Sequence, residues 1–78
     1  MKPLYSIYDQ IAGFYSPVFL AENDAHATRM FSQSIDLNHK KDFSLWCLGN
    51  FDADTGFIKT HKAPELVSQG LKLEEPQQ

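Results

Sequence analysis

Two pairs of strand-like runs, separated by one amphipathic stretch, constrain the fold of this chain most strongly. In residues 4–8 and 14–20, large aromatic and aliphatic side chains alternate with small or polar ones, a pattern that is typical of β-strands. The intervening residues 9–13 end in Gly13, which tolerates a positive φ angle, so we expect an antiparallel hairpin. Pro17 lacks a backbone N–H and therefore predicts a sheet edge or a bulge at its position.

The second pair of runs covers residues 43–48 and 57–60, joined by the turn sequence of residues 52–56. A turn that is symmetric about Asp54 predicts three cross-strand pairs: Phe51 with Phe57, Leu48 with Thr60, and Trp46 with Lys62. One face of this hairpin then carries Phe43, Leu45, Cys47, Phe51 and Phe57, and the other carries Trp46, Leu48, Ile58, Thr60 and Lys62. Both faces are therefore substantially apolar.

Between the two hairpins lies a segment with the spacing of an amphipathic helix. Asn23 and Asp24 are favourable N-cap residues. The apolar side chains that recur at helical intervals after them are Ala27, Met30, Phe31 and Ile35. This spacing predicts a helix of about three turns, which the polar segment 36–42 is expected to end.

The order of hairpin, helix and hairpin predicts an α+β fold (ββαββ), with a four-stranded, mainly antiparallel sheet and the helix on one face. Because 78 residues can build only one core, residues 1–73 are expected to form a single α+β domain. The polar residues 74–78 are expected to be a disordered C-terminal tail. Residues 64–70 fit either one short helical turn that stops at Gly70 or an extended segment against the sheet edge, and both alternatives stay open.

One short helix cannot cover two apolar sheet faces, so the uncovered face predicts an interaction surface. One interpretation is a homodimer, or a complex with another protein, whose interface contains Trp46, Leu48 and Ile58. Another is a stacking platform on which Trp46 and nearby tyrosines receive the unpaired bases of single-stranded DNA. The cationic side chains that would neutralise phosphates in that case are Lys40, Lys41, Lys59, His61 and Lys62.

The sequence carries no pattern that favours catalysis, a cofactor or a metal. Residues 52–57 begin like a calcium loop, but Phe57 stands at the position that requires glycine. The three histidines lack the close spacing of zinc sites, and Cys47 lies in an apolar run that favours a buried, inert thiol. We therefore expect a binding protein rather than an enzyme, with no cofactor and no metal.

Net charge, cysteine content and the length of the apolar stretches limit what the protein is expected to bind and where it is expected to be found. The formal net charge of -3 disfavours non-specific binding to nucleic acid through net charge, while a local basic patch is still compatible with it. A single cysteine allows no disulfide within the chain and favours a reducing environment. No leader-like or membrane-spanning segment is expected, because no apolar stretch approaches twenty residues.

Several short motifs, taken in order, resemble the small non-structural protein family of gokushovirus-like microviruses. They are the opening residues 1–9, then Pro17-Val18-Phe19, Asn23-Asp24-Ala25 and Arg29-Met30-Phe31, and later residues 42–49, Phe51-Asp52 and Thr55-Gly56. The resemblance spans about residues 2–70.

This resemblance implies a non-structural accessory protein of a phage with a single-stranded DNA genome. It would act in genome replication or packaging in the host cytoplasm, by binding single-stranded DNA, viral or host replication proteins, or both. The alternative is a homodimeric interaction module that binds a host or viral protein and has no nucleic-acid role.

Overall fold

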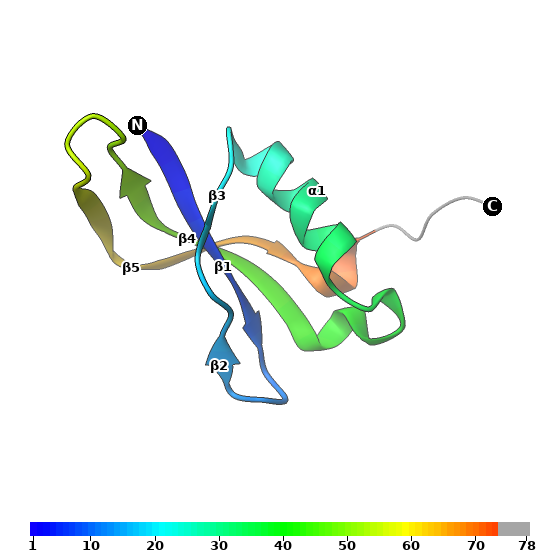
Figure 1. Ribbon diagram of the computed structural model, residues 1–78. Helices are drawn as coiled ribbons and strands as arrows, with labels where there is room; N and C mark the ends of the chain where they lie inside the picture. Colours follow the sequence, from blue (N-terminus) through cyan, green and yellow to red (C-terminus); the bar gives the residue numbers. More distant parts are fainter. Residues whose placement is uncertain (74–78) are drawn as a thin grey trace.

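The computed structural model describes residues 1–73, which fold as one antiparallel sheet and one main helix (Figure 1). The elements in chain order are β1 (Lys2–Asp9), β2 (Phe14–Tyr15), β3 (Phe19–Leu20), α1 (Asp24–Ser34), the 3-10 segment η1 (Leu37–Asp42), β4 (Phe43–Phe51), β5 (Ile58–Gln69) and the 3-10 turn η2 (Gly70–Lys72). The strands lie in the order β2-β1-β4-β5, and β3 also pairs with β1. The predicted α+β class is thus confirmed. The predicted tail, residues 74–78, lies outside the described residues.

The first hairpin forms as expected, but its second strand is divided in two. β2 and β3 both pair with β1, at Tyr8 opposite Tyr15 and at Leu4 opposite Leu20, so the sheet has five strands instead of four. The interruption contains Pro17, which cannot donate to the ladder. There the hydroxyl of Ser16 replaces a ladder partner by accepting the Ile7 N–H at 3.0 Å.

The helix buries the apolar stripe that the sequence predicts. Asn23 is the N-cap, and its side-chain oxygen accepts the N–H of His26 at 2.8 Å. Ala27 and Phe31 are fully buried against Tyr5 and Leu45 of the two central strands. Met30, Ile35, Phe43 and Cys47 are among the partly buried side chains that surround this core. The core therefore lies between α1 and one face of the sheet.

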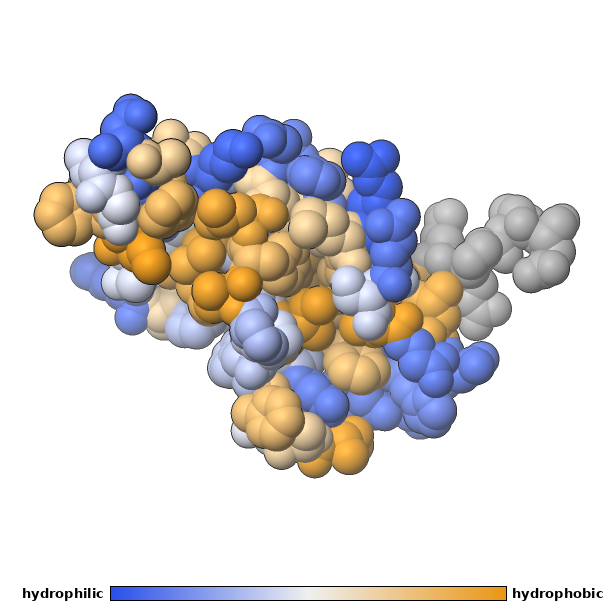
Figure 2. Space-filling model, viewed as in Figure 1, coloured by the Kyte–Doolittle hydropathy of each residue, from blue (hydrophilic) through white to orange (hydrophobic). Residues whose placement is uncertain are grey.

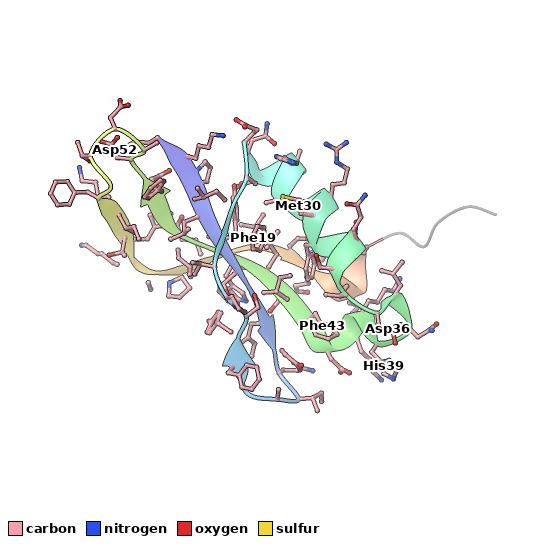
Figure 3. All side chains as sticks on the ribbon, in the orientation of Figure 1. Phe19, Met30, Asp36, His39, Phe43 and Asp52 are labelled. Carbon is pink, nitrogen blue, oxygen red and sulfur yellow. The ribbon has the colours of Figure 1, made fainter. Side chains whose placement is uncertain are left out.

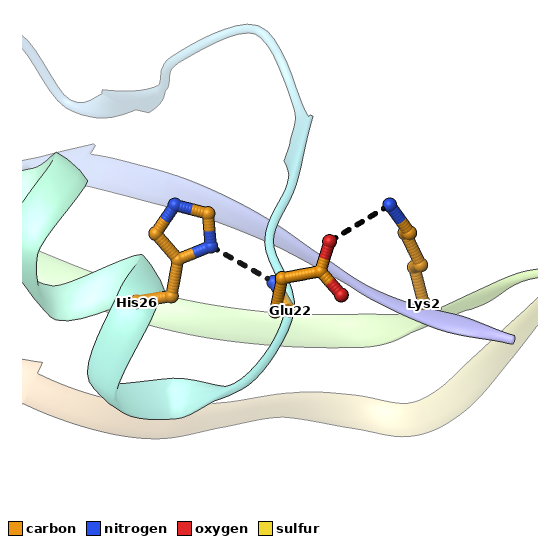
Figure 4. A network of polar contacts seen from close by, with 3 residues as sticks. All are labelled: Lys2, Glu22 and His26. Atoms are coloured by element: carbon orange, nitrogen blue, oxygen red, sulfur yellow. Dashed lines mark hydrogen bonds and ion pairs between the residues drawn. The ribbon is translucent and has the colours of Figure 1, made fainter.

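Two polar contacts tie the start of α1 to β1. The hydroxyl of Tyr5 is buried and donates to the Asp24 carboxylate at 2.7 Å. At the surface, Lys2 Nζ lies 2.9 Å from Glu22 Oε1, and the Glu22 N–H donates to His26 Nδ1 at 3.1 Å (Figure 4). The segment between β3 and α1 is thereby held against the sheet.

The register of the second hairpin differs from the symmetric prediction. Phe51 pairs with Ile58 instead of Phe57, Gly49 rather than Leu48 pairs with Thr60, and Trp46 pairs with Leu66 instead of Lys62. The register skips Leu48 on both sides of β4, because Leu4 pairs with Gly49 and Tyr5 with Cys47. Leu48 is thus a bulged residue, and a bulge exchanges the faces of the residues beyond it.

The extra residues of β5 lie between Thr60 and Glu65, which pair with Gly49 and Cys47. β5 stays extended through this irregular stretch and through Pro64 up to Gln69, so the extended alternative for residues 64–70 is correct. Gly70 then begins η2 and is buried. A Cβ atom at Gly70 would overlap the carbonyl oxygen of Lys40, so glycine is required there by close approach of two backbones.

The layers are unequal in extent. α1 lies over the part of the sheet at the right of Figure 1, whereas the tip of the β4–β5 hairpin extends beyond it at the upper left. Figure 2 shows an apolar band across the centre of the helix side, where Figure 3 labels Phe19 and Met30. Phe57, at the hairpin tip, is 75% exposed.

Candidate binding groove on the free sheet face

The face of the sheet opposite α1, called the free face here, is built from cross-strand rows. Tyr8, Ser44 and Gln69 form one row across β1, β4 and β5, and Ser6, Trp46 and Leu66 form the next. Residues that pair in an antiparallel sheet project from the same face. Leu45, one position from Trp46 along β4, points the other way into the core. The free face therefore carries Tyr8 and Trp46 as diagonal neighbours on adjacent strands.

A groove with a volume of about 380 Å³ follows these two rows. Its lining residues are Tyr8, Gln10, Lys41, Phe43, Ser44, Trp46, Leu66, Gln69 and Leu71. None of these is acidic, although the chain has ten carboxylate side chains and a formal charge of -3. The lining residues thus carry one positive charge, that of Lys41, in a protein whose net charge is negative.

Hydrogen bonding and ring contacts orient two of the three aromatic side chains that line the groove, Trp46 and Tyr8. Trp46 is half-buried, and its indole Nε1–H donates to Ser44 Oγ at 2.8 Å. The ring of Tyr8 packs against the ring of Tyr15 with centroids 4.8 Å apart and an interplanar angle of 51°. Held in this way, the rings lose little further freedom when a flat ligand stacks on them.

The structure brings together only part of the predicted cationic set. Lys41 lines the groove with Trp46. Lys40 instead donates to the carbonyl oxygen of Leu73 at 2.7 Å, an interaction that joins η1 to the end of the described chain. Lys40 and Lys41 are therefore adjacent in sequence but engaged differently.

The remaining predicted cations lie on β5, away from the groove lining. Lys59 pairs with Asn50 near the hairpin tip and lines a separate depression with Met1 and Phe57. His61 is half-buried; its Nδ1 lies 3.0 Å from Glu65 Oε1, at an ion-pair distance but without hydrogen-bond geometry. Lys62 is exposed in the irregular stretch of β5. Asn50, the partner of Lys59, lies four residues from Trp46 along β4, which corresponds to about 13 Å. Figure 3 labels Phe43 and Asp52 near the two ends of β4.

The predicted interface residues are not buried in the monomer. Trp46 and Leu48 are half-buried, and Ile58 is 54% exposed. Phe51, which the symmetric turn placed with Cys47, lies instead on the free face, because it pairs with Lys2 of β1 and Ile58 of β5. The Leu48 bulge accounts for this change of face.

Sequence reasoning found Trp46 and Lys41 but missed most of the groove lining. Leu66 comes beside Trp46 because β5 carries extra residues after Thr60, and Gln69 comes beside Ser44 because the register also skips Val67. Tyr8 was anticipated only as one of several nearby tyrosines. Its alternation with Ser6 along β1 is the signal that could have identified it, once β1 is known to lie beside β4.

Within residues 1–73 the structure brings together no group of side chains suited to a metal site or to cysteine chemistry. Within that range no three histidine, cysteine or acidic side chains are grouped so that they could hold a metal ion. Cys47 is half-buried, and burial raises the pKa of its thiol, which disfavours the reactive thiolate. No helix in the described residues is long and apolar enough to cross a membrane.

The sequence profile of the family described as "Phage ORF5 protein" matches residues 2–73. The chain belongs to this phage protein family. No curated protein and no solved structure matches it. The family match covers every residue of the groove lining. It confirms the phage part of the resemblance, whereas the narrower assignment to gokushovirus-like microviruses stays a prediction.

Proposed function

We propose that this member of the phage ORF5 family is a non-enzymatic accessory protein of single-stranded DNA genome replication or packaging in the host cytoplasm. It binds single-stranded DNA in the groove of the free face, and its further contacts are with viral or host replication proteins. No cofactor or metal takes part. The observation that carries this proposal is the groove itself: two oriented aromatic rings and Lys41, with no carboxylate from residues 1–73 in the lining, in an acidic protein.

The chemistry of the groove suits unpaired bases. Aromatic side chains receive bases of any sequence by stacking, which contributes about 1–3 kcal/mol per base. A cation beside the rings meets the phosphate that follows the stacked base. Lys41 holds that position in the groove, whereas a contact with Lys59 would require a strand that continues about 13 Å along the sheet.

Fluorescence titration tests this proposal directly, because Trp46 is the only tryptophan of the chain. Adding an oligothymidylate of about eight nucleotides at low salt should quench the emission, and raising the salt concentration should weaken the binding. A Lys41→Gln variant should bind more weakly and show a shallower salt dependence. Arg29→Gln is the matched control, since Arg29 is exposed on α1, on the other side of the sheet from the groove, and it should bind the oligonucleotide like the unchanged protein.

Two outcomes would remove the DNA-binding proposal. One is the absence of quenching at low salt. The other is an equal effect of the Lys41 and Arg29 changes, which would mean that binding depends on overall charge and not on the groove.

A second candidate function is favoured by the exposed apolar side chains that flank Trp46. Ile58 is 54% exposed and Leu66 is 48% exposed, and both share the free face with Trp46. An exposed apolar patch is suited to a two-fold symmetric dimer, because each copy can bury its patch against that of the other. In this case the protein is a homodimeric module that binds a host or viral protein.

Light scattering separates the two candidates. If the free face is a dimer interface, the unchanged protein has the mass of two chains and Trp46→Ala has the mass of one. If the face is a DNA platform, the mass of the unchanged protein is that of one chain and does not depend on Trp46. A dimeric mass that survives Trp46→Ala would place the interface elsewhere.

A further inference from the structure

We infer that the groove of the free face prefers an unpaired purine over an unpaired pyrimidine. This inference rests on the proposed function and adds the class of base that the site takes. It follows from which polar side chains surround the two aromatic rings.

A base that stacks on Tyr8 and Trp46 lies roughly along the sheet and presents its edge to the side chains around it. The polar groups in that position are Gln10, Lys41 and Gln69, together with the Ser44 hydroxyl that already accepts the Trp46 N–H. Gln69 stands in the same cross-strand row as Tyr8 and Ser44. Its amide is therefore beside the rings and not remote from them.

The hydrogen-bonding groups of these side chains match purine edges. A glutamine amide pairs in two-point fashion with N6 and N7 of adenine, and a lysine ammonium donates to O6 and N7 of guanine. The exocyclic amine of cytosine is best read by a carboxylate, and no carboxylate of residues 1–73 lines the groove. A purine also has the larger ring surface for stacking.

The size of the groove suits one base with its sugar. Its volume of about 380 Å³ lies near the lower end of the range for small-molecule sites. A duplex cannot place a paired base flat on these rings, so the purine must be unpaired. The site is thus expected to read one position in a strand whose remaining nucleotides bind through their phosphates.

The experiment uses the full chain and a set of oligothymidylates of about eight nucleotides in which only the central base differs. Trp46 emission gives the dissociation constant for central adenine, guanine, cytosine and thymine at one salt concentration. We expect central adenine or guanine to bind about 10-fold more tightly than central cytosine. Gln69→Leu should reduce the preference for adenine and leave the affinity for the all-thymine strand nearly unchanged.

A charge-changing variant and a surface control sharpen the test. Gln69→Glu introduces a carboxylate beside the rings and should move the preference from adenine towards cytosine. Gln33→Leu removes an exposed amide on α1, outside the groove lining, and should change no affinity. Circular dichroism of each variant establishes that the fold is kept.

The possible results separate this inference from the proposed function. Equal affinity for all four central bases would overturn the purine preference and leave DNA binding in place. A purine preference that persists unchanged in Gln69→Leu and Gln69→Glu would overturn the role of Gln69. Absence of binding to every strand would overturn both proposals.

Discussion

The two faces of the sheet are made from alternate residues of the same strands, yet their side chains differ in how far they are buried. Leu45 on the helix side is fully buried with Tyr5 and Phe31. One residue further along β4, Trp46 is half-buried, and its partner Leu66 is 48% exposed. The helix side therefore supplies most of the core, while the part of the free face around Trp46 keeps large apolar side chains in contact with water. Such exposed side chains contribute little to stability, and their exposure is the observation behind the proposed binding role.

The largest loss in the free energy of unfolding is expected when a buried side chain on the helix side of the sheet is shortened. Leu45→Ala leaves a cavity beneath α1 and should lower the free energy of unfolding by about 2–5 kcal/mol. Urea unfolding followed by circular dichroism measures the change. A loss below about 1 kcal/mol would mean that the covered face is no better packed than the free one, and the comparison would fail.

The next largest effect is expected where the backbone of η2 closes one end of the core. Gly70→Ala would push a methyl group into the carbonyl oxygen of Lys40, so η1 and η2 must separate. Overpacking of this kind should cost about 1–3 kcal/mol in the free energy of unfolding. The matched control is Gly13→Ala, where a Cβ atom meets no atom within 4 Å and only the positive φ of 82° opposes alanine. A loss below about 1 kcal/mol for Gly70→Ala would show that the contact with Lys40 is unimportant.

A smaller effect is expected at the polar contact between the helix side and α1. Tyr5→Phe removes the hydrogen bond to Asp24 and should lower the free energy of unfolding by about 1 kcal/mol at neutral pH. Urea unfolding of Tyr5→Phe measures this loss. A variant as stable as the unchanged protein would show that the buried hydroxyl adds nothing to the fixing of α1.

The same contact predicts a dependence on alkaline pH. Burial, together with the hydrogen bond to Asp24, raises the pKa of Tyr5 above the ordinary value of 10.0. The unfolded chain therefore loses this proton first, and the free energy of unfolding should fall as the pH rises above about 10. The raised pKa of the Cys47 thiol acts in the same direction. In Tyr5→Phe the alkaline decline should be shallower, and an unchanged decline would assign it to other groups.

The sequence predicts the covered face better than the free one, and the reason is the range of the interactions. The stripe of Ala27 and Phe31, the Asn23 cap and the first turn with Gly13 depend on neighbours within a few residues. The register of β5 depends on the Leu48 bulge and on the extra residues after Thr60. These features have no local sequence signal, because a bulge is set by how two distant strands fit together.

The same difference explains the outcome for the candidate site. Trp46 and Lys41 are recognisable by residue type alone, but their neighbours in the groove are not. Leu66 and Gln69 reach the groove only through the shifted register. The symmetric turn placed Lys62 opposite Trp46, and the structure places Leu66 there. The predicted cation at that point is therefore replaced by an apolar side chain.

The smallest effect on stability is expected from Leu66→Ala. This variant also tests most directly whether the two faces of the sheet differ in role. Leu66 and Leu45 lie on opposite faces of the sheet. Because Leu66 is 48% exposed, its truncation should lower the free energy of unfolding by less than about 1 kcal/mol, well below the cost at Leu45. It should nevertheless weaken oligonucleotide binding severalfold in the Trp46 fluorescence titration, since Leu66 is the cross-strand partner of Trp46 in the groove. If Leu66→Ala instead destabilises the protein as strongly as Leu45→Ala and leaves binding intact, the free face belongs to the core, and its large apolar residues serve folding and not recognition.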